Sequence, residues 1–137
     1  MVLVRLAGSA PVTRINCVPV TELSDKMLGA EYRELPRICA LVRARAQAGY
    51  KPTDAEFATV PEYTLGRGHV KFFFTRMMWI EHRYYDLVTE CQRRGRAVNY
   101  PKLDLSGIPD EWFGYWQPDS RALRINRERL KERGNYE

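Results

Sequence analysis

The chain has 137 residues, 45% of them hydrophobic, which is enough for one domain whose core needs no disulfide or metal support. Its three cysteines are widely spaced and form no CxxC pair, which argues against a disulfide framework or a zinc site and favours a reducing, cytoplasmic location. No apolar run approaches the ~18 residues of a membrane span. The net charge is +5, and arginine supplies 17 of the 22 basic residues, so a nucleic acid or another polyanion is the favoured partner.

The N-terminal residues differ in character from the chain that follows them. Arg5 interrupts their apolar stretch, which is also too short for the core of a signal peptide. We therefore expect residues 1–12 to be a leader and residues 13–137 to form a single domain. Residues 13–20 read as an extended segment that ends in a loop, because Pro19 disfavours a helix.

A first helix is predicted from about residue 25 to about residue 48, with Gly49 as its stop. Side chains that can cap its start are Thr21, Ser24 and Asp25. Apolar residues recur at helical spacing and supply a core-facing stripe of Leu28, Tyr32, Leu35, Ile38 and Val42. Pro36 lies inside this pattern, and its missing N–H predicts a bend or a loosened turn.

The same helix carries two carboxylates and two guanidinium groups between Glu31 and Arg37. Arg33 and Arg37 lie one turn apart on one face, and Glu34 occupies the adjoining strip. One interpretation is a carboxylate flanked by arginines that faces an anionic partner. The other, which spacing alone favours, is an ordinary solvated helix with intrahelical ion pairs.

A loop with a short helical turn near residues 54–58 is predicted between residues 51 and 68. Its end, Gly66-Arg67-Gly68, allows the backbone to approach a phosphate closely, with His69 and Lys71 as further donors. A turn that leads into a buried aromatic run explains the same residues equally well. Both interpretations stay open at this level.

A second helix is predicted from a Thr75 cap to about Arg94, with Gly95 as its stop. Its apolar seam consists of Met77, Ile80, Tyr84, Leu87 and Cys91, broadened by Met78, Trp79 and Val88. This seam is interpreted as core packing, and His82 is expected at the surface.

The loop of residues 95–118 gathers four aromatic residues that could stack on bases or cover a small core: Trp112, Phe113, Tyr115 and Trp116. A third helix then runs from Asp119 or Ser120 to about Arg133 and carries six cations against two anions. Such a helix is a solvated tail or a contact to a polyanion, and its arginine content favours the contact. The predicted fold class is all-α: one compact domain of three helices joined by long loops, without a sheet.

Several blocks of the chain resemble the pyrimidine dimer DNA glycosylase family (the bacteriophage endonuclease V-like enzymes), in the same order over about residues 13–133. These blocks are Thr13–Asn16, Ala30–Arg37, Leu65–Val70 with Phe72–Phe73, Glu90–Cys91 with Arg94–Gly95, and Ile108–Pro109. The resemblance implies a compact domain of three helices that uses no metal or organic cofactor. It also implies an enzyme that removes one base of a cyclobutane pyrimidine dimer in ultraviolet-damaged DNA and then nicks the abasic site by β-elimination.

The resemblance assigns a role to individual residues. Thr13 matches the family's N-terminal threonine, whose α-amine attacks the sugar and forms an imine, and Glu34 matches the catalytic carboxylate that assists it. The positions that match DNA-contacting arginines are Arg14, Arg33, Arg37, Arg129 and Arg133. The implied partner is double-stranded DNA that contains photoproducts or abasic sites, without a membrane, and a monomer fits this size and a one-site grip.

The sequence departs from the family pattern in three places. Thr13 follows Val12, so its nitrogen is an amide unless translation begins at Val12 through a GUG codon or a protease removes the leader. Met27 replaces a polar ring, and only Tyr136 remains of an aromatic, basic tail. The alternatives are a non-catalytic nucleic-acid-binding module with a blocked Thr13, a lysine nucleophile such as Lys71, or a glycosylase for other lesions.

Overall fold

The computed structural model describes residues 14–136 of the chain. The predicted leader, residues 1–12, and the expected nucleophile Thr13 lie outside the described residues, as does Glu137. The predicted division between leader and domain is therefore not tested by the fold.

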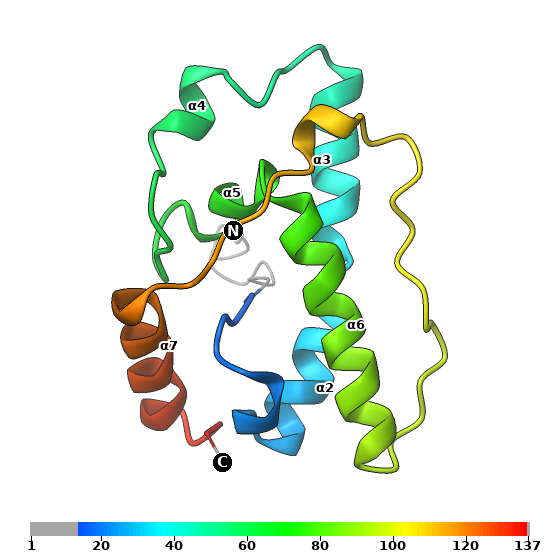
Figure 1. The fold of residues 1–137 in the computed structure, drawn as a ribbon, viewed down its shortest axis with the longest axis vertical. Helices are drawn as coiled ribbons and strands as arrows, with labels where there is room; N and C mark the ends of the chain where they lie inside the picture. Colours follow the sequence, from blue (N-terminus) through cyan, green and yellow to red (C-terminus); the bar gives the residue numbers. More distant parts are fainter. Residues whose placement is uncertain (1–13, 137) are drawn as a thin grey trace, which may run out of the picture.

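Residues 14–136 are helical and contain no strand beyond two isolated bridges, Leu23 to Tyr136 and Arg76 to Phe113. The elements in chain order are η1 Val20–Glu22, α2 Asp25–Glu34, α3 Arg37–Gln47, α4 Ala55–Ala58, α5 His69–Phe74, α6 Met77–Arg93, η2 Asp110–Trp112 and α7 Ser120–Glu132 (Figure 1). This confirms the all-α class, whereas the described residues hold more helices than the three predicted. No helix in this part of the chain combines the length and apolarity that crossing a membrane would need.

The first predicted helix is divided in two at Pro36, as its missing N–H led us to expect. Helix α2 ends at Glu34 and α3 begins at Arg37, and the turn between them closes through a hydrogen bond from Ile38 N to Leu35 O at 3.1 Å. Both helices run along the same side of the molecule in Figure 1. The break places Glu34 at the last position of α2 and Arg37 at the first position of α3.

Helix α5 was not predicted as a helix, and the glycine-rich loop before it serves to start it. Gly68 is the N-cap residue, with a φ of +88° that side chains disfavour, and a Cβ there would meet Val60 at 3.0 Å. Phe72, Phe73 and Phe74 all point into the core. The structure therefore supports the interpretation of this loop as a turn before a buried aromatic run.

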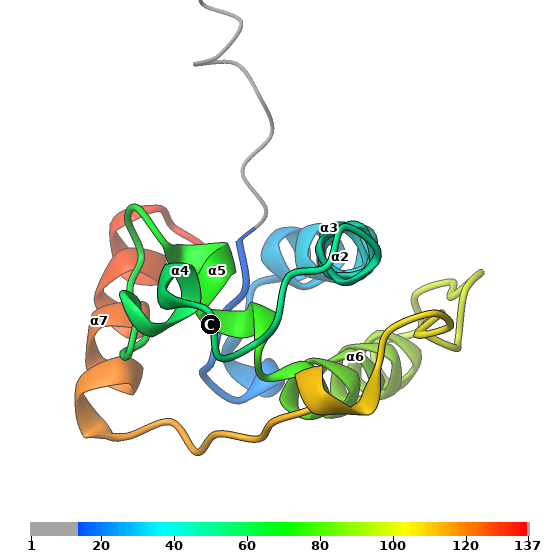
Figure 2. The ribbon, with the colours of Figure 1, turned by 90° about the horizontal axis from the view of Figure 1, so that it is seen from above.

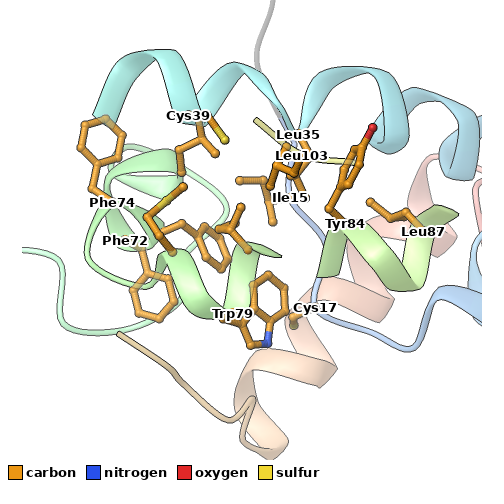
Figure 3. Close-up of a cluster of buried hydrophobic side chains, with 14 of the residues drawn as sticks. Ile15, Cys17, Leu35, Cys39, Phe72, Phe74, Trp79, Tyr84, Leu87 and Leu103 are labelled. Carbon is orange, nitrogen blue, oxygen red and sulfur yellow. The ribbon is translucent and has the colours of Figure 1, made fainter. Parts of the chain in front are cut away.

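Helix α6 buries the seam that was predicted for it. Met77, Ile80, Tyr84, Leu87 and Cys91 are at most 1% exposed. Figure 3 shows Tyr84 and Leu87 with Trp79 among core side chains from α3 and α5. Met78 was expected to broaden the seam and is instead 41% exposed, because its position turns it by about 100° from Met77 toward the outer face.

Trp112 and Trp116 of the 95–118 loop close the core, whereas Tyr100 and Tyr115 are exposed. Trp112 is fully buried. Trp116 stacks on Tyr63 with ring centroids 5.6 Å apart and meets Phe72 edge-on at 5.0 Å. Of the two interpretations of this loop, the contacts favour the core cover.

Residues 15–18 run through the interior between α7 on one side and α2 and α6 on the other. Helix α2 packs against α6, while α7 stands on the far side of the molecule in Figures 1 and 2. Cys17 Sγ contacts Ala122 O of α7 at 3.6 Å, and Val18 O accepts from Arg83 of α6 at 2.5 Å. The N-terminal segment thus joins two parts of the fold that touch each other little.

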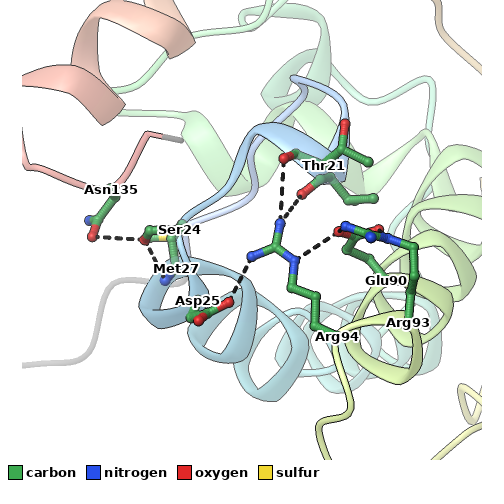
Figure 4. Close-up of polar contacts among 9 residues, drawn as sticks. Thr21, Ser24, Asp25, Met27, Glu90, Arg93, Arg94 and Asn135 are labelled. Carbon is green, nitrogen blue, oxygen red and sulfur yellow. Dashed lines mark hydrogen bonds and ion pairs between the residues drawn. The ribbon is translucent and has the colours of Figure 1, made fainter.

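An arginine at the end of α6 ties three elements together (Figure 4). Arg94 contacts Glu90 of its own helix at 2.8 Å, Asp25 at the start of α2 at 2.9 Å, and the carbonyls of Val20 and Thr21 in η1 at 3.4 Å. The nearby arginines hold the pKa of the Glu90 carboxyl low, at about 2. Glu90 and Arg94 therefore have a structural role at the end of α6. Their contacts hold the start of α2 against α6.

Candidate active site and nucleic-acid interface

A buried polar network anchors the N-terminal segment under α2. The carboxylate of Glu31 pairs with Arg83, with Nε to Oε2 at 2.8 Å and Nη2 to Oε1 at 3.1 Å, and both side chains are at most 4% exposed. Asn16 donates to Glu31 Oε1 at 2.8 Å and accepts from Asn126 Nδ2 at 2.8 Å. One chain of contacts therefore links the segment to α2, α6 and α7, and each charge in it has a partner.

The sequence predicted Glu31 on the helix surface with Glu34, either beside an anionic partner or in a solvated intrahelical ion pair. Both interpretations were wrong for Glu31. Glu31 makes no intrahelical pair and faces no solvent; its partner lies 52 residues away on α6. A signal for this was present in the sequence. Glu31 falls three residues after Leu28 and four before Leu35, within the apolar stripe.

Arg14, Arg129 and Arg133 converge around a small pocket of about 40 Å³. Arg14 Nη1 is buried without a hydrogen-bond partner in the described part of the chain. Burial, followed by the charges of Arg129 and Arg133, lowers the pKa of Arg14 from its usual value. A buried donor without a partner, next to two further guanidinium groups, favours a bound anion such as phosphate.

Glu34 lies on the side of α2 that also carries Met27. It is seven residues, or two turns, from Met27, which lines the pocket and is drawn at the start of α2 in Figure 4. Glu34 is half-buried and makes no hydrogen bond or ion pair with any residue between 14 and 136. The carboxylate is therefore left available for another partner.

Arg33 and Arg37 occupy the exposed crest on the other flank, and neither has an ion-pair partner among residues 14–136. Arg33 borders an open cavity of about 590 Å³ that Tyr32 also lines. Gly29 makes room at this cavity, because a Cβ there would lie 2.5 Å from Arg96 Nη2 and 3.2 Å from Arg33 Nη1. Arg33 therefore lies beside a cavity, and Arg37 lies four residues further along the chain, exposed at the start of α3.

Residues that follow α6 supply the far wall of this cavity, and sequence reasoning had passed over them. Arg96, Tyr100 and Lys102 line it, and Tyr100 N donates to the hydroxyl of Tyr32 at 3.0 Å. Two basic groups and an exposed aromatic ring in one loop were a readable signal. The prediction for this loop rested only on its later aromatic residues, Trp112, Phe113, Tyr115 and Trp116.

Two groups expected to contact phosphate are engaged inside the protein. His69 is buried and both of its ring nitrogens have partners, so the interpretation of His69 as a phosphate donor was wrong. Lys71 pairs with Glu56 at 3.0 Å. On α7, Arg127 makes a two-pronged contact with Glu22, with both distances 2.9 Å, so this arginine is also engaged inside the protein.

Among the described residues, α2 thus carries a carboxylate without a partner, its Met27 lines a basic pocket and its Arg33 borders a cavity. A sequence model of the family described as pyrimidine dimer DNA glycosylase matches residues 12–104. That match spans well over half of the 137-residue chain and includes Glu34 and the arginine-rich crest of α2. The chain belongs to the pyrimidine dimer DNA glycosylase family.

Proposed function

We propose that this protein is a DNA repair enzyme that excises a base of cyclobutane pyrimidine dimers and then nicks the abasic site through an imine with the Thr13 α-amine. The observation that carries the proposal is the setting of Glu34. It is a carboxylate without a partner among residues 14–136, on the helix whose Met27 lines the pocket of three arginines and whose Arg33 borders the cavity. Such a group stabilises positive charge on a sugar while cationic side chains hold the phosphates around it.

In the proposed reaction the neutral amine of Thr13 forms a bond to C1′ of the damaged nucleotide as the N-glycosidic bond breaks and the base leaves with a proton. Opening of the C1′–O4′ bond then gives the imine, and O4′ takes up a proton. Removal of a C2′ proton leads to β-elimination, in which the C3′–O bond breaks and the phosphate departs. Glu34 stabilises the cationic sugar and imine and relays these protons.

The amine suits this role because its ordinary pKa is near 8, so an appreciable fraction is neutral near pH 7. Arg14 adjoins Thr13 in the sequence, and Arg129 and Arg133 lie next to Arg14. Like charges disfavour a protonated amine, so this cluster should increase the neutral fraction further. A free amine requires that Thr13 be the first residue, and we propose that translation begins at Val12 and the initiating methionine is removed.

The proposed DNA grip uses basic groups on both flanks of α2. The pocket of Arg14, Arg129 and Arg133 takes one phosphate, and Arg33 and Arg37 take phosphates that flank the lesion. The cavity of about 590 Å³ beside Arg33 is large enough for a nucleotide displaced from the duplex. One protomer carries all of these groups, so the proposed form is a monomer on double-stranded DNA.

The test is imine trapping with a protein that begins at Thr13. Borohydride should link it covalently to DNA that contains an abasic site, and the same protein should cleave ultraviolet-treated DNA. The matched control retains residues 1–12, and its amide nitrogen should give no adduct. If both forms bind DNA and neither gives an adduct, the protein is a binding module and not an enzyme. If the protein cleaves only DNA with other lesions, its substrate is not the pyrimidine dimer.

A further inference from the structure

The backbone of Ile15 is held by two buried side chains from the region around α5. Ile15 N donates to His69 Nε2 at 2.8 Å, and the hydroxyl of Tyr63 donates to Ile15 O at 3.0 Å. Both side chains are at most 4% exposed. Residue 15 therefore has its N–H and its carbonyl satisfied by side chains rather than by a neighbouring strand.

The tautomer of His69 follows from its second contact. His69 Nδ1 lies 2.6 Å from the carbonyl of Thr64, which can only accept, so Nδ1 carries the proton and Nε2 is the acceptor. Burial is the main reason that the pKa of His69 falls to about 4, and the charges of Arg14 and Arg129 act in the same direction. The ring is therefore neutral at physiological pH and keeps Nε2 free to accept from Ile15.

This anchor is two residues from the proposed nucleophile in the sequence. Two residues span at most about 7 Å of extended chain, so an anchor at Ile15 N limits how far from it the nitrogen of Thr13 can reach. Further along the segment, Asn126 Oδ1 accepts from Cys17 N at 2.7 Å and from Val18 N at 3.1 Å. The segment is thus fixed at both of its ends, with His69 at the end nearer to Thr13.

We infer that His69 is a positioning residue for the proposed reaction: its Nε2 fixes the backbone of Ile15 and thereby sets where the Thr13 amine stands relative to Glu34. The inference rests on the proposed function. A packing role alone would not need a histidine, because a phenylalanine would fill the same space between Tyr63 and Phe73, whose rings lie 5.6 and 5.9 Å from the imidazole. What the imidazole adds is an acceptor for a buried N–H that no strand satisfies.

The experiment compares His69→Phe with His69→Gln in the protein that begins at Thr13. Phenylalanine keeps the aromatic contacts and lacks the acceptor, whereas the glutamine carbonyl can accept from Ile15 N. The matched control is His82→Phe, the same change at the exposed histidine of α6. Three quantities are measured for each protein: thermal unfolding, affinity for abasic-site DNA, and the single-turnover rate of borohydride-trapped adduct.

We expect His69→Phe to slow adduct formation by about 10- to 100-fold, the range for a displacement of a reacting group by about 1 Å. Affinity for DNA should change by less than about twofold, because the phosphate-binding arginines remain. His69→Gln should recover most of the rate, and His82→Phe should match the unmodified protein. Adduct formation at an unchanged rate in folded His69→Phe, or loss of rate and affinity in parallel, would overturn the positioning role.

Failure of the proposed function looks different, because the unmodified protein itself would then form no adduct. If His69→Phe does not fold, the comparison moves to Tyr63→Phe, which removes only the hydroxyl that holds Ile15 O. That variant should slow the adduct by a smaller factor, with affinity for DNA unchanged. A full rate in Tyr63→Phe together with a lost rate in Glu34→Gln would place the chemistry at Glu34 and exclude the Ile15 anchor.

Discussion

Glu31 and Glu34 lie three residues apart on α2 and differ in burial, in partners and in the roles we assign to them. Glu31 is enclosed, paired with Arg83 and bonded to Asn16, and it joins the N-terminal segment to the core. Glu34 is half-buried at the last position of the same helix, without a partner among the described residues. Less than one turn of helix thus separates a structural carboxylate from a candidate catalytic one. The difference lies in what packs against each face, since the side chains are chemically identical.

The largest effect is expected from removing the charge of Glu34. Glu34→Gln should lower strand cleavage by about 10²- to 10⁴-fold, because the proton transfers and the charge on the sugar lose their carboxylate. Stability should change by less than about 0.5 kcal/mol, as for surface positions in general. Gel assays of cleavage and binding on abasic-site DNA measure this. Equal loss of binding and cleavage would assign Glu34 to the DNA grip instead.

The same loss of charge at Glu31 should act on folding. Glu31→Ala leaves Arg83 buried and unpaired, and the free energy of unfolding should fall by about 3–5 kcal/mol. Urea denaturation gives the value. The control is the double variant Glu31→Leu with Arg83→Met, which replaces the whole pair by apolar groups and should be more stable than the single variant. A single variant as stable as the original would mean that the pair is not enclosed as described.

Acid should weaken the N-terminal anchor through His69. Its folded-state pKa of about 4 lies below the usual 6.5, so between these pH values the unfolded chain binds a proton that the folded chain excludes. The free energy of unfolding should fall by on the order of 3 kcal/mol as the pH is lowered across this range, and His69 should contribute no change above it. Urea titrations at several pH values compare the protein with His69→Gln. Parallel curves for the two proteins would contradict the assignment.

The smallest effect is expected from removing the exposed guanidinium group of Arg37. Arg37→Ala should weaken DNA binding by about tenfold, as for the loss of one charge-assisted contact, and lower the slope of log affinity against log salt by about 0.9. The matched control is Arg124→Ala, since Arg124 is exposed on α7 and lines neither cavity. Affinities measured at several salt concentrations decide this. An unchanged slope would remove Arg37 from the phosphate contacts.

Local patterns in the sequence identified two helix caps and the core stripes, whereas the cap predicted at Thr75 was wrong, because the N-cap of α6 is Arg76 and Thr75 ends α5. Ser24 accepts from Met27 N at 3.1 Å and Asp119 from Ala122 N at 2.8 Å, so both helices have caps at predicted positions. Pro36 divides the first predicted helix into α2 and α3. Gly49, the predicted stop, follows the end of α3 with a φ of +94°. Helix α5 was missed because six residues between a glycine turn and an aromatic run carry too little periodicity to identify a helix.

What the sequence by itself determined is therefore the all-α class, the caps at Ser24 and Asp119, the break at Pro36 and the apolar stripes, because each depends on neighbours within one or two turns. Only the tertiary structure decided that Glu31 is enclosed, that Asn126 binds a segment 109 residues away, and that Arg14 meets Arg129 and Arg133. Helical spacing tells which residues share a face, but not which other element covers that face. The burial of a side chain, its hydrogen-bond partners and its pKa shift all depend on the element that covers its face of the helix. The roles of Glu31 and Glu34 therefore became distinct only once α6 and the N-terminal segment were packed against α2.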